Sequence, residues 1–236
     1  MTQQTSPSEI ARIFDAEVRD PDGHAEPGAR YNVAPTQPVS VVVQRDEGRF
    51  VELHRWGLVP ASSDRPTTSG RLINARAETV ARTPAFRVSF QRRRCIVPAD
   101  GFYEWRREGR QRQPYLISGQ QPGPLAFAGL WAPWHDSGSG NWLMSAAVIT
   151  TAANRALAEL HDRMPVVLPR AAWELWLDRM VQDVALLEEM LRPAADELLT
   201  LRPVSPRVNS PHNEGPDLVL PYTAPATPGL FATGPG

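Results

Sequence analysis

The chain has 236 residues, of which 42% are hydrophobic and 22% are charged, and its formal net charge is −1. This length suits one domain with a core of its own, and near neutrality argues against capture of nucleic acid by the field of the whole molecule. No apolar run approaches the roughly 18 residues that cross a bilayer, and the start "MTQQTSPSEI" has neither region of a signal peptide, so we expect a cytoplasmic protein.

Cysteine and lysine are informative by their scarcity. Cys95 is the single cysteine, which excludes an internal disulfide and a multi-cysteine metal site, and the five scattered histidines have no metal-binding spacing. We therefore expect no metal and no cofactor. All 25 basic residues are arginine, so the one primary amine of the chain is its α-amine. Any imine chemistry must take place there.

The first third of the chain predicts one helix and then paired strands. Residues 6–18 are expected to be helical, because Ser6 and Glu9 form a capping box and apolar residues recur at helical spacing. A β-branched strand is expected at residues 39–43. The stretch "RFVELHRWGLVP" alternates like a strand, which predicts pairing with residues 39–43 across the "RDEG" turn.

The rest of the chain predicts short strands followed by helices. The expected strands are 72–74, 95–98, 102–105, 115–117, 126–130 and 144–149, and the expected helices are 152–160, 170–177 and 182–192. This order predicts an α+β fold, with one domain over residues 1–209 built on a coiled, mostly antiparallel, barrel-like sheet with peripheral helices. Residues 210–236 are rich in proline and glycine and predict a disordered tail.

Arginine is concentrated in the middle of the chain. Residues 87–112 contain eight arginines and three acidic residues. The structural explanation, a solvated strand edge or loop, is favoured over a basic face for nucleic acid.

Three polar residues stand near predicted element ends, where a site can be assembled: Asn74 in "RLINARAET", Glu104 in "GFYEW" and His161 in "ELHDRMP". Each also has a structural explanation, as a strand cap, an arginine partner or a residue at a helix C-terminus. Burial among aromatic rings raises the pKa of a carboxyl, so Glu104 is either a satisfied structural acid or a tuned proton carrier.

Taken together and in order, the stretches "YNVAPTQ", "RWGLVP", "INARAET", "RRCIVPADGFYEW", "HDRMPVVL" and "VN" resemble the SRAP family, the SOS-response-associated peptidases or abasic-site processing proteins. The resemblance covers roughly residues 5–209. It implies a monomer that binds single-stranded DNA and attaches itself covalently to abasic sites. In the family, a cysteine exposed by removal of the initiator methionine reacts: its amine forms an imine with the sugar aldehyde, and its thiol closes a thiazolidine.

The resemblance also assigns roles to residues of this chain. It implies that Asn74 orients the nucleophile and the sugar, that Glu104 carries the proton, and that His161 is its acid–base partner. It implies DNA contacts by the following residues: Arg76, Trp105, Trp56, Arg163, Met164 and Pro165. The activities that it implies are self-processing peptidase and DNA lyase chemistry, in the service of DNA repair and the SOS response.

The N-terminus departs from the family. The family begins Met-Cys-Gly-Arg and an aromatic residue, whereas this chain begins "MTQQT", and Cys95 lies in a predicted core strand. We expect that the first residue is an internal methionine and that the reactive cysteine lies upstream. The alternative is a complete chain whose amine forms a transient imine and promotes β-elimination without closing the ring.

Two functions of other classes stay open at this point. One is a cysteine hydrolase that uses Cys95 with His161. The other is a non-enzymatic module that binds single strands through Arg76, the arginine-rich middle and exposed tryptophans. Alkylation of Cys95 and the dependence of binding on an abasic site distinguish these alternatives from the covalent mechanism.

Overall fold

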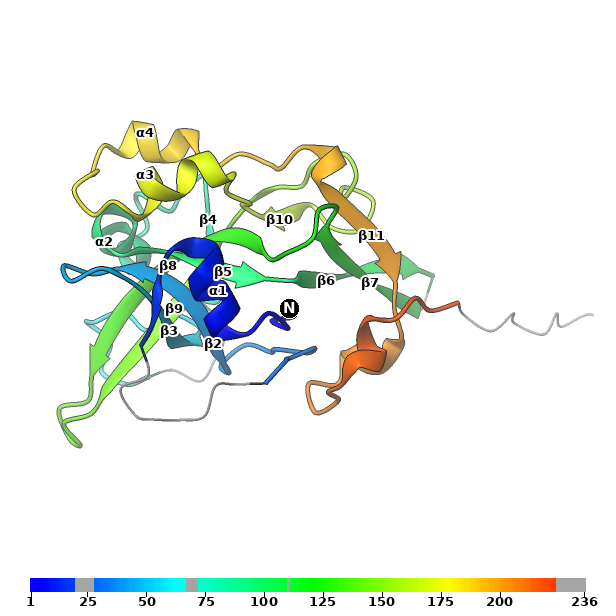
Figure 1. The fold of residues 1–236 in the computed structure, drawn as a ribbon, viewed down its shortest axis with the longest axis horizontal. Helices are drawn as coiled ribbons and strands as arrows, with labels where there is room; N and C mark the ends of the chain where they lie inside the picture. The colour runs from blue at the N-terminus through cyan, green and yellow to red at the C-terminus, as the bar shows by residue number, and fades with distance from the viewer. Residues whose placement is uncertain (20–27, 67–71, 110, 224–236) are drawn as a thin grey trace, which may run out of the picture.

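The computed structural model describes residues 1–19, 28–66, 72–109 and 111–223, and five of its strands close a barrel (Figure 1). They are β2 Pro38–Gln44, β3 Arg49–Trp56, β5 Arg94–Ala99, β8 Leu125–His135 and β9 Trp142–Ala152. Their order is β3-β2-β5-β8-β9, in antiparallel pairs, and β3 closes the barrel by pairing in parallel with β9. The predicted α+β fold with a barrel-like, mostly antiparallel sheet is confirmed.

The remaining strands extend the barrel or form a second sheet. β1 Glu17–Val18 pairs with β3, while β4 Asn74–Arg76 and β10 Arg163–Pro165 pair with β9. The second sheet has the order β11-β7-β6, from β6 Gly101–Glu108, β7 Gln111–Gly119 and β11 Leu199–Pro203. The predicted strands are confirmed, except that 72–74 starts only at Asn74, and β1, β10 and β11 were not predicted. Asp100 alone separates β5 from β6, so the strand of Glu104 leaves directly from the barrel.

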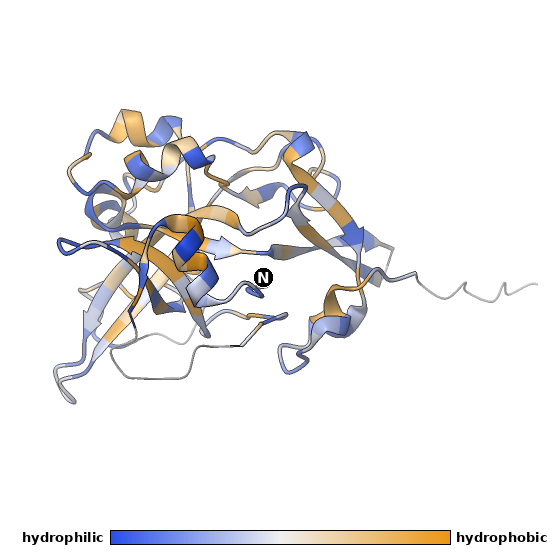
Figure 2. Ribbon diagram, in the orientation of Figure 1, coloured by the Kyte–Doolittle hydropathy of each residue, from blue (hydrophilic) through white to orange (hydrophobic). Residues whose placement is uncertain are grey.

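Alternation along the barrel strands sorts their side chains into two apolar layers. Val41 and Val43 belong to the cluster inside the barrel, with Cys95, whereas Val42 and Ile96 belong to the cluster under the helices. Figure 2 shows hydrophobic stretches along these strands. Each fully buried valine or isoleucine contributes about 1.5–3 kcal/mol. The barrel is therefore packed on both faces, and a site has room only at its ends and edges.

Four α-helices lie outside the barrel within the described part of the chain: α1 Pro7–Phe14, α2 Pro84–Arg92, α3 Trp173–Leu177 and α4 Val184–Glu189. The 3-10 turn η1 Arg170–Ala172 precedes α3, so the predicted helix at 170–177 is confirmed, and α4 is a shorter version of 182–192. None of the described helices is long and apolar enough to cross a membrane. The helix predicted at 6–18 ends early, because Asp15 adopts a left-handed conformation with φ 52° and Arg49 Nη1 donates to the Phe14 carbonyl at 2.8 Å.

Two other expectations were wrong. Residues 152–160 are not helical, because the β9–β10 ladder uses Ala152 and the Asn154 side chain donates to the Ala194 carbonyl at 3.0 Å, which leaves turns at 155–160. The arginine run is not a loop at its start: Arg87 and Arg92 lie on α2, and Arg94 is only 2% exposed. The helix at 84–92 was not predicted, because its arginines interrupt the helical spacing of its apolar residues.

Part of the predicted disordered tail is folded. The 3-10 turns η2 Asp196–Leu198, η3 Pro206–Asn209 and η4 Pro216–Val219 lead the chain along β11 and past β6 and β7. Leu218 is fully buried in a cluster with Val204, Val208 and Tyr103. These apolar residues give 210–223 the buried surface that its composition did not predict, while 224–236 lies outside the described residues.

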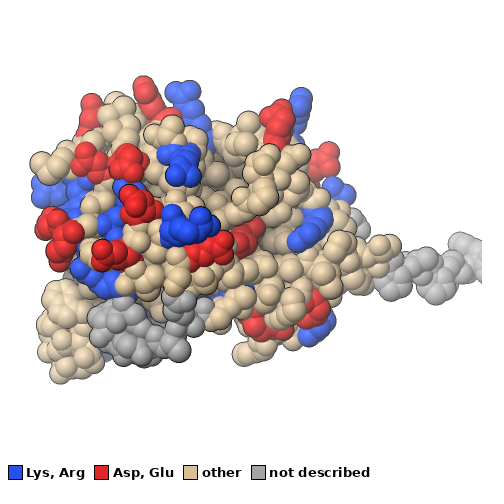
Figure 3. Space-filling view, in the orientation of Figure 1, with Lys and Arg blue, Asp and Glu red and all other residues tan. Residues whose placement is uncertain are grey.

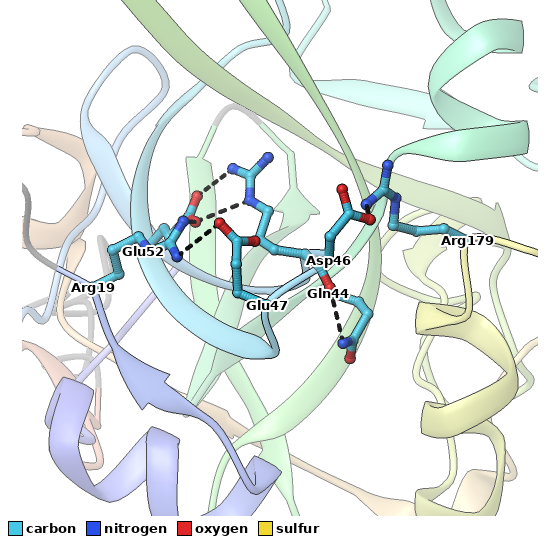
Figure 4. Close-up of polar contacts among 7 residues, drawn as sticks. Arg19, Gln44, Asp46, Glu47, Glu52 and Arg179 are labelled. Atoms are coloured by element: carbon cyan, nitrogen blue, oxygen red, sulfur yellow. Dashed lines mark hydrogen bonds and ion pairs between the residues drawn. The ribbon is translucent and has the colours of Figure 1, made fainter.

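A network of charged side chains lies at the β2–β3 turn (Figure 4). Glu52 accepts from Arg45 Nη2 at 2.6 Å and lies 3.0 Å from His54 Nε2, and these bonds lower its pKa to about 2 against the cost of burial. The Arg45 guanidinium also stacks on Trp131 at 4.0 Å. On the face in Figure 3, acidic and basic side chains lie next to one another without a broad patch of one sign. Charges of both signs are thus mixed on this face.

Candidate functional site

The chain begins inside the molecule, as the middle strand of a small sheet. The Met1 amine donates to the Val33 carbonyl at 3.0 Å, and the Val33 N–H donates to the Met1 carbonyl at 2.8 Å. On the other edge, the Thr2 N–H donates at 2.8 Å to the carbonyl of Gly101, the first residue of β6. The α-amine thus lies beside the start of β6 and is removed from bulk water (Figure 1).

Side chains fix this N-terminal strand in one register. Gln3 Nε2 donates to the carbonyls of Ser40 at 3.0 Å and Pro98 at 2.7 Å, and its Oε1 accepts from the Ser40 N–H at 3.0 Å. The Asp100 carboxylate accepts from the N–H of Thr5 at 3.0 Å before α1 begins. The first helix therefore leads away from an amine that is held in place rather than loose.

Burial changes the protonation of the amine. It lowers the pKa of the Met1 amine to about 5; the Arg30 charge acts in the same direction, while Glu104 and Glu214 act in the opposite one. An amine with this pKa is mainly neutral at pH 7, which is the nucleophilic form.

Glu104 and His161 form an electrostatic group with this amine. Glu104 is half-buried on β6, and burial raises its pKa above the usual range of a carboxyl. The positive charges of His161 and the Met1 amine partly oppose this rise, and Asp162 reinforces it. The predicted acid, the predicted imidazole and the amine are thus close enough to influence one another.

The backbone orients His161. The Arg163 N–H donates to His161 Nδ1 at 3.0 Å, so the neutral imidazole carries its proton on Nε2. The Arg163 guanidinium donates to Glu78 at 2.7 Å and 3.0 Å and to the Thr150 carbonyl at 2.5 Å. Glu78, which sequence reasoning missed although it follows Arg76 in "INARAET", therefore holds the start of β10, directly after the loop that carries His161.

The other predicted site residues gather along β9. Asn74 and Arg76 are exposed on β4 and lie opposite Val148 and Thr150 of β9. Arg163 and Pro165 lie on β10, which also pairs with β9. β9 thus lies between the strand of Asn74 and Arg76 and the strand of Arg163 and Pro165. Met164 is different: it is fully buried, with 0% exposure, and so presents no surface to DNA.

The two predicted tryptophans are half-buried and anchored by their indole nitrogens. Trp56 Nε1 donates to the Ile73 carbonyl at 3.1 Å, and Trp105 Nε1 donates to Asn209 Oδ1 at 2.7 Å. Fixed indoles lose little conformational entropy when a base stacks on them. Their role in stacking stays a prediction.

Cys95 lies inside the barrel and is fully buried. Burial raises the pKa of its thiol, so the reactive thiolate is suppressed. We expect iodoacetamide to leave Cys95 unmodified in the folded protein and to modify it once denaturant unfolds the chain, as intact mass measures. Equal rates in the two states would contradict this placement and would return the cysteine hydrolase to consideration.

Comparison with known proteins agrees with this fold and these motifs. Residues 1–211 match the family model described as SOS response associated peptidase, or SRAP. The chain is 35% identical over 212 residues to the abasic site processing protein YoqW of Bacillus subtilis, covering 89% of this chain and 93% of the relative. It is 31% identical over 223 residues to the abasic site processing protein YedK of Escherichia coli, covering 92% and 96%. A solved protein from Bacteroides thetaiotaomicron, 24% identical and covering 94% of this chain and 98% of that one, shares the fold with a TM-score of 0.82.

The family match covers the segment of the buried amine, the strand of Glu104 and the loop of His161. The chain therefore belongs to the SOS response associated peptidase family.

Proposed function

We propose that this protein processes abasic sites in single-stranded DNA, with its α-amine as the nucleophile. The observation that carries the proposal is a buried amine, largely neutral at pH 7, next to a carboxyl with a raised pKa, in a chain without lysine. An amine of this kind attacks the open-chain aldehyde of an abasic sugar to give a carbinolamine, and a nearby acid then assists the loss of water. Relatives of nearly the same length are named abasic site processing proteins, which supports the same substrate here.

The site residues divide this work. Glu104 gives a proton to the departing hydroxyl of the carbinolamine, which leaves as water and produces an iminium ion. His161, with Nε2–H available, is the acid–base partner, and Asn74 orients the sugar. Arg76 and Arg163 contact the phosphates next to the abasic sugar.

Trp56 and Trp105 form the stacking surfaces for flanking bases, and Pro165 lines the pocket between them and the sugar. No second subunit is needed, so the proposed protein acts as a monomer.

The nature of residue 1 sets the stability of the adduct. A thioether has no S–H, so a chain that begins with Met1 forms an imine but not a thiazolidine. The lyase activity belongs to the same proposal, as β-elimination from the imine. Self-processing belongs to it for a chain that extends upstream of the reacting residue, where it would remove the residue ahead of the nucleophile.

The experiment is reductive trapping on a single-stranded oligonucleotide with one abasic site. We expect a covalent adduct only when borohydride is present, with a yield that rises as the pH passes about 5, where the amine loses its proton. The matched control is an oligonucleotide with a tetrahydrofuran residue, which has no aldehyde and should give no adduct. Equal, salt-dependent binding of both oligonucleotides without any trapped adduct would replace the proposal with a non-covalent binding module.

A further inference from the structure

The folded C-terminal segment 204–222 forms part of the wall around the amine. The Val204 N–H donates to the Pro114 carbonyl at 3.0 Å, and Val208 and Leu218 pack against Tyr103, the neighbour of Glu104 on β6. Trp105 bonds to Asn209 in the same segment. This segment therefore reaches the site from outside the barrel.

An irregularity in the N-terminal sheet receives the segment. Met1 pairs with Val33 and Gln3 pairs with Arg30, so one residue on the first strand lies opposite two residues on the second, 31 and 32. Such a bulge leaves backbone groups unpaired within the ladder and redirects side chains, and bulges are frequent beside active sites. The groups of residues 31 and 32 are thereby free to bind a third segment.

Both bulged residues bind the C-terminal segment. Asn32 Nδ2 donates to the carbonyls of Val208 at 3.2 Å, Ser210 at 2.9 Å and Asn213 at 3.2 Å. The next residue, Glu214, accepts from the Tyr31 N–H, and the Tyr31 carbonyl accepts from the Tyr103 hydroxyl at 2.6 Å. The carboxylate of Glu214 is thus fixed two residues from Val33, which holds the amine.

Among the residues that the structure describes, three charged groups act on the amine: Arg30, Glu104 and Glu214. The Arg30 guanidinium is turned toward the Pro38 carbonyl at 2.7 Å and Gln37 Oε1 at 2.5 Å, and Glu104 also interacts with His161 and Asp162. Since Glu104 must gain and lose a proton during the proposed reaction, its charge varies. Glu214 is the acid that a backbone N–H holds in a fixed position.

We propose that Glu214 is a second acidic residue of the site, a positioning residue whose fixed carboxylate stabilises the positive charge of the iminium ion formed at the α-amine. This inference rests on the proposed function. When the amine nitrogen bonds to the aldehyde carbon and the hydroxyl leaves as water with a proton from Glu104, the nitrogen becomes cationic. A carboxylate that keeps its charge throughout lowers the free energy of that cation.

The test compares Glu214→Gln with the wild type, in chains whose intact mass shows Met1 retained. Glutamine still accepts from the Tyr31 N–H but has no charge. Because the chain has no lysine, acetylation by acetic anhydride at low reagent concentration reports on the α-amine, and its rate follows the neutral fraction. We expect the pH at which the acetylation rate is half-maximal, the acetylation midpoint, to move toward acid by about half a pH unit in Glu214→Gln. The yield of trapped adduct at pH 7 should fall about threefold or more.

Two further variants make the result specific. Asp217→Asn removes a carboxylate of the same segment that pairs with Arg207 instead, and should leave the midpoint unchanged. Glu214→Asp keeps the charge and should keep the wild-type midpoint even where the glutamine variant folds poorly. An aspartate variant shifted as far as the glutamine variant, or a glutamine variant with an unshifted midpoint, would overturn the inference.

The acetylation readout needs no DNA, so it separates the two proposals. A shifted midpoint in a protein that traps no abasic DNA would keep the role of Glu214 at the amine and remove the proposed function. Normal trapping of abasic DNA by the wild type, with an unchanged midpoint and yield in the glutamine variant, would keep the proposed function and remove the role of Glu214.

Discussion

Replacing Glu104 by glutamine is expected to slow the trapping of abasic DNA by about 100-fold. The physical reason is that loss of water from the carbinolamine needs a proton at the leaving oxygen, and burial raises the pKa of Glu104, which favours the protonated carboxyl. Glutamine has nearly the same shape but donates no such proton. The measurement is the initial rate of adduct formation under saturating borohydride.

The dependence of this rate on pH is a sharper test than its size. In the wild type, the rate should rise as the pH passes about 5, where the amine becomes neutral, and fall as the pH passes the raised pKa of Glu104, where the acid loses its proton. The glutamine variant should lose the falling limb and keep the rising one. A purely structural role for Glu104 would lower both limbs without changing the shape of the curve.

The control for Glu104 is the same substitution at an exposed acid. Glu47 at the β2–β3 turn is exposed and paired with Arg19 at 3.6 Å, so Glu47→Gln should trap at the wild-type rate (Figure 4). A Glu104 variant with wild-type rate and profile would remove this residue from the mechanism.

The sequence predicted that the pKa of Glu104 is raised but attributed it to the wrong neighbours. Phe102 packs inside the barrel cluster, whereas Tyr103 and Trp105 pack in the separate C-terminal cluster. Successive residues of a strand point to opposite faces, so adjacent rings in sequence do not surround the carboxylate. Its charged neighbours, the Met1 amine, His161 and Asp162, come from segments that only the folded chain brings to β6.

The contacts between distant segments were the part that the sequence could not predict. Local sequence patterns identified strands β2 to β9, at least in part, but missed β1, β10 and β11. Glu214 has no motif around it, and its place in the site depends on a bulge at residues 31 and 32, about 180 residues earlier in the chain. The buried position of Arg94 depends in the same way on the end of α3, which follows it by more than 80 residues.

Replacing Arg94 by methionine is expected to lower the free energy of unfolding by about 3–5 kcal/mol. The Arg94 guanidinium is 2% exposed and donates to five backbone carbonyls: Trp176 at 2.6 Å, Phe90 at 2.9 Å, Gln91 at 2.7 Å, Val181 at 2.9 Å, and Asp178. These carbonyls come from the end of α2, the end of α3 and, for Val181, the connection between α3 and α4. One side chain thus satisfies the C-terminal acceptors of two helices and joins them to β5.

Methionine fills the same space without a donor, so these carbonyls would be left buried without partners, at about 1–3 kcal/mol for each that water does not reach. Burial lowers the pKa of Arg94 only to about 10, so the guanidinium keeps all its protons at neutral pH and the loss should be the same from pH 6 to pH 8. Urea unfolding measures it, with Arg92→Met, two residues earlier and exposed on α2, as the matched control. If the two variants unfold at the same urea concentration, water replaces the guanidinium at the helix ends, and the junction between α2, α3 and β5 is held by apolar packing around Trp176 and Phe90 alone.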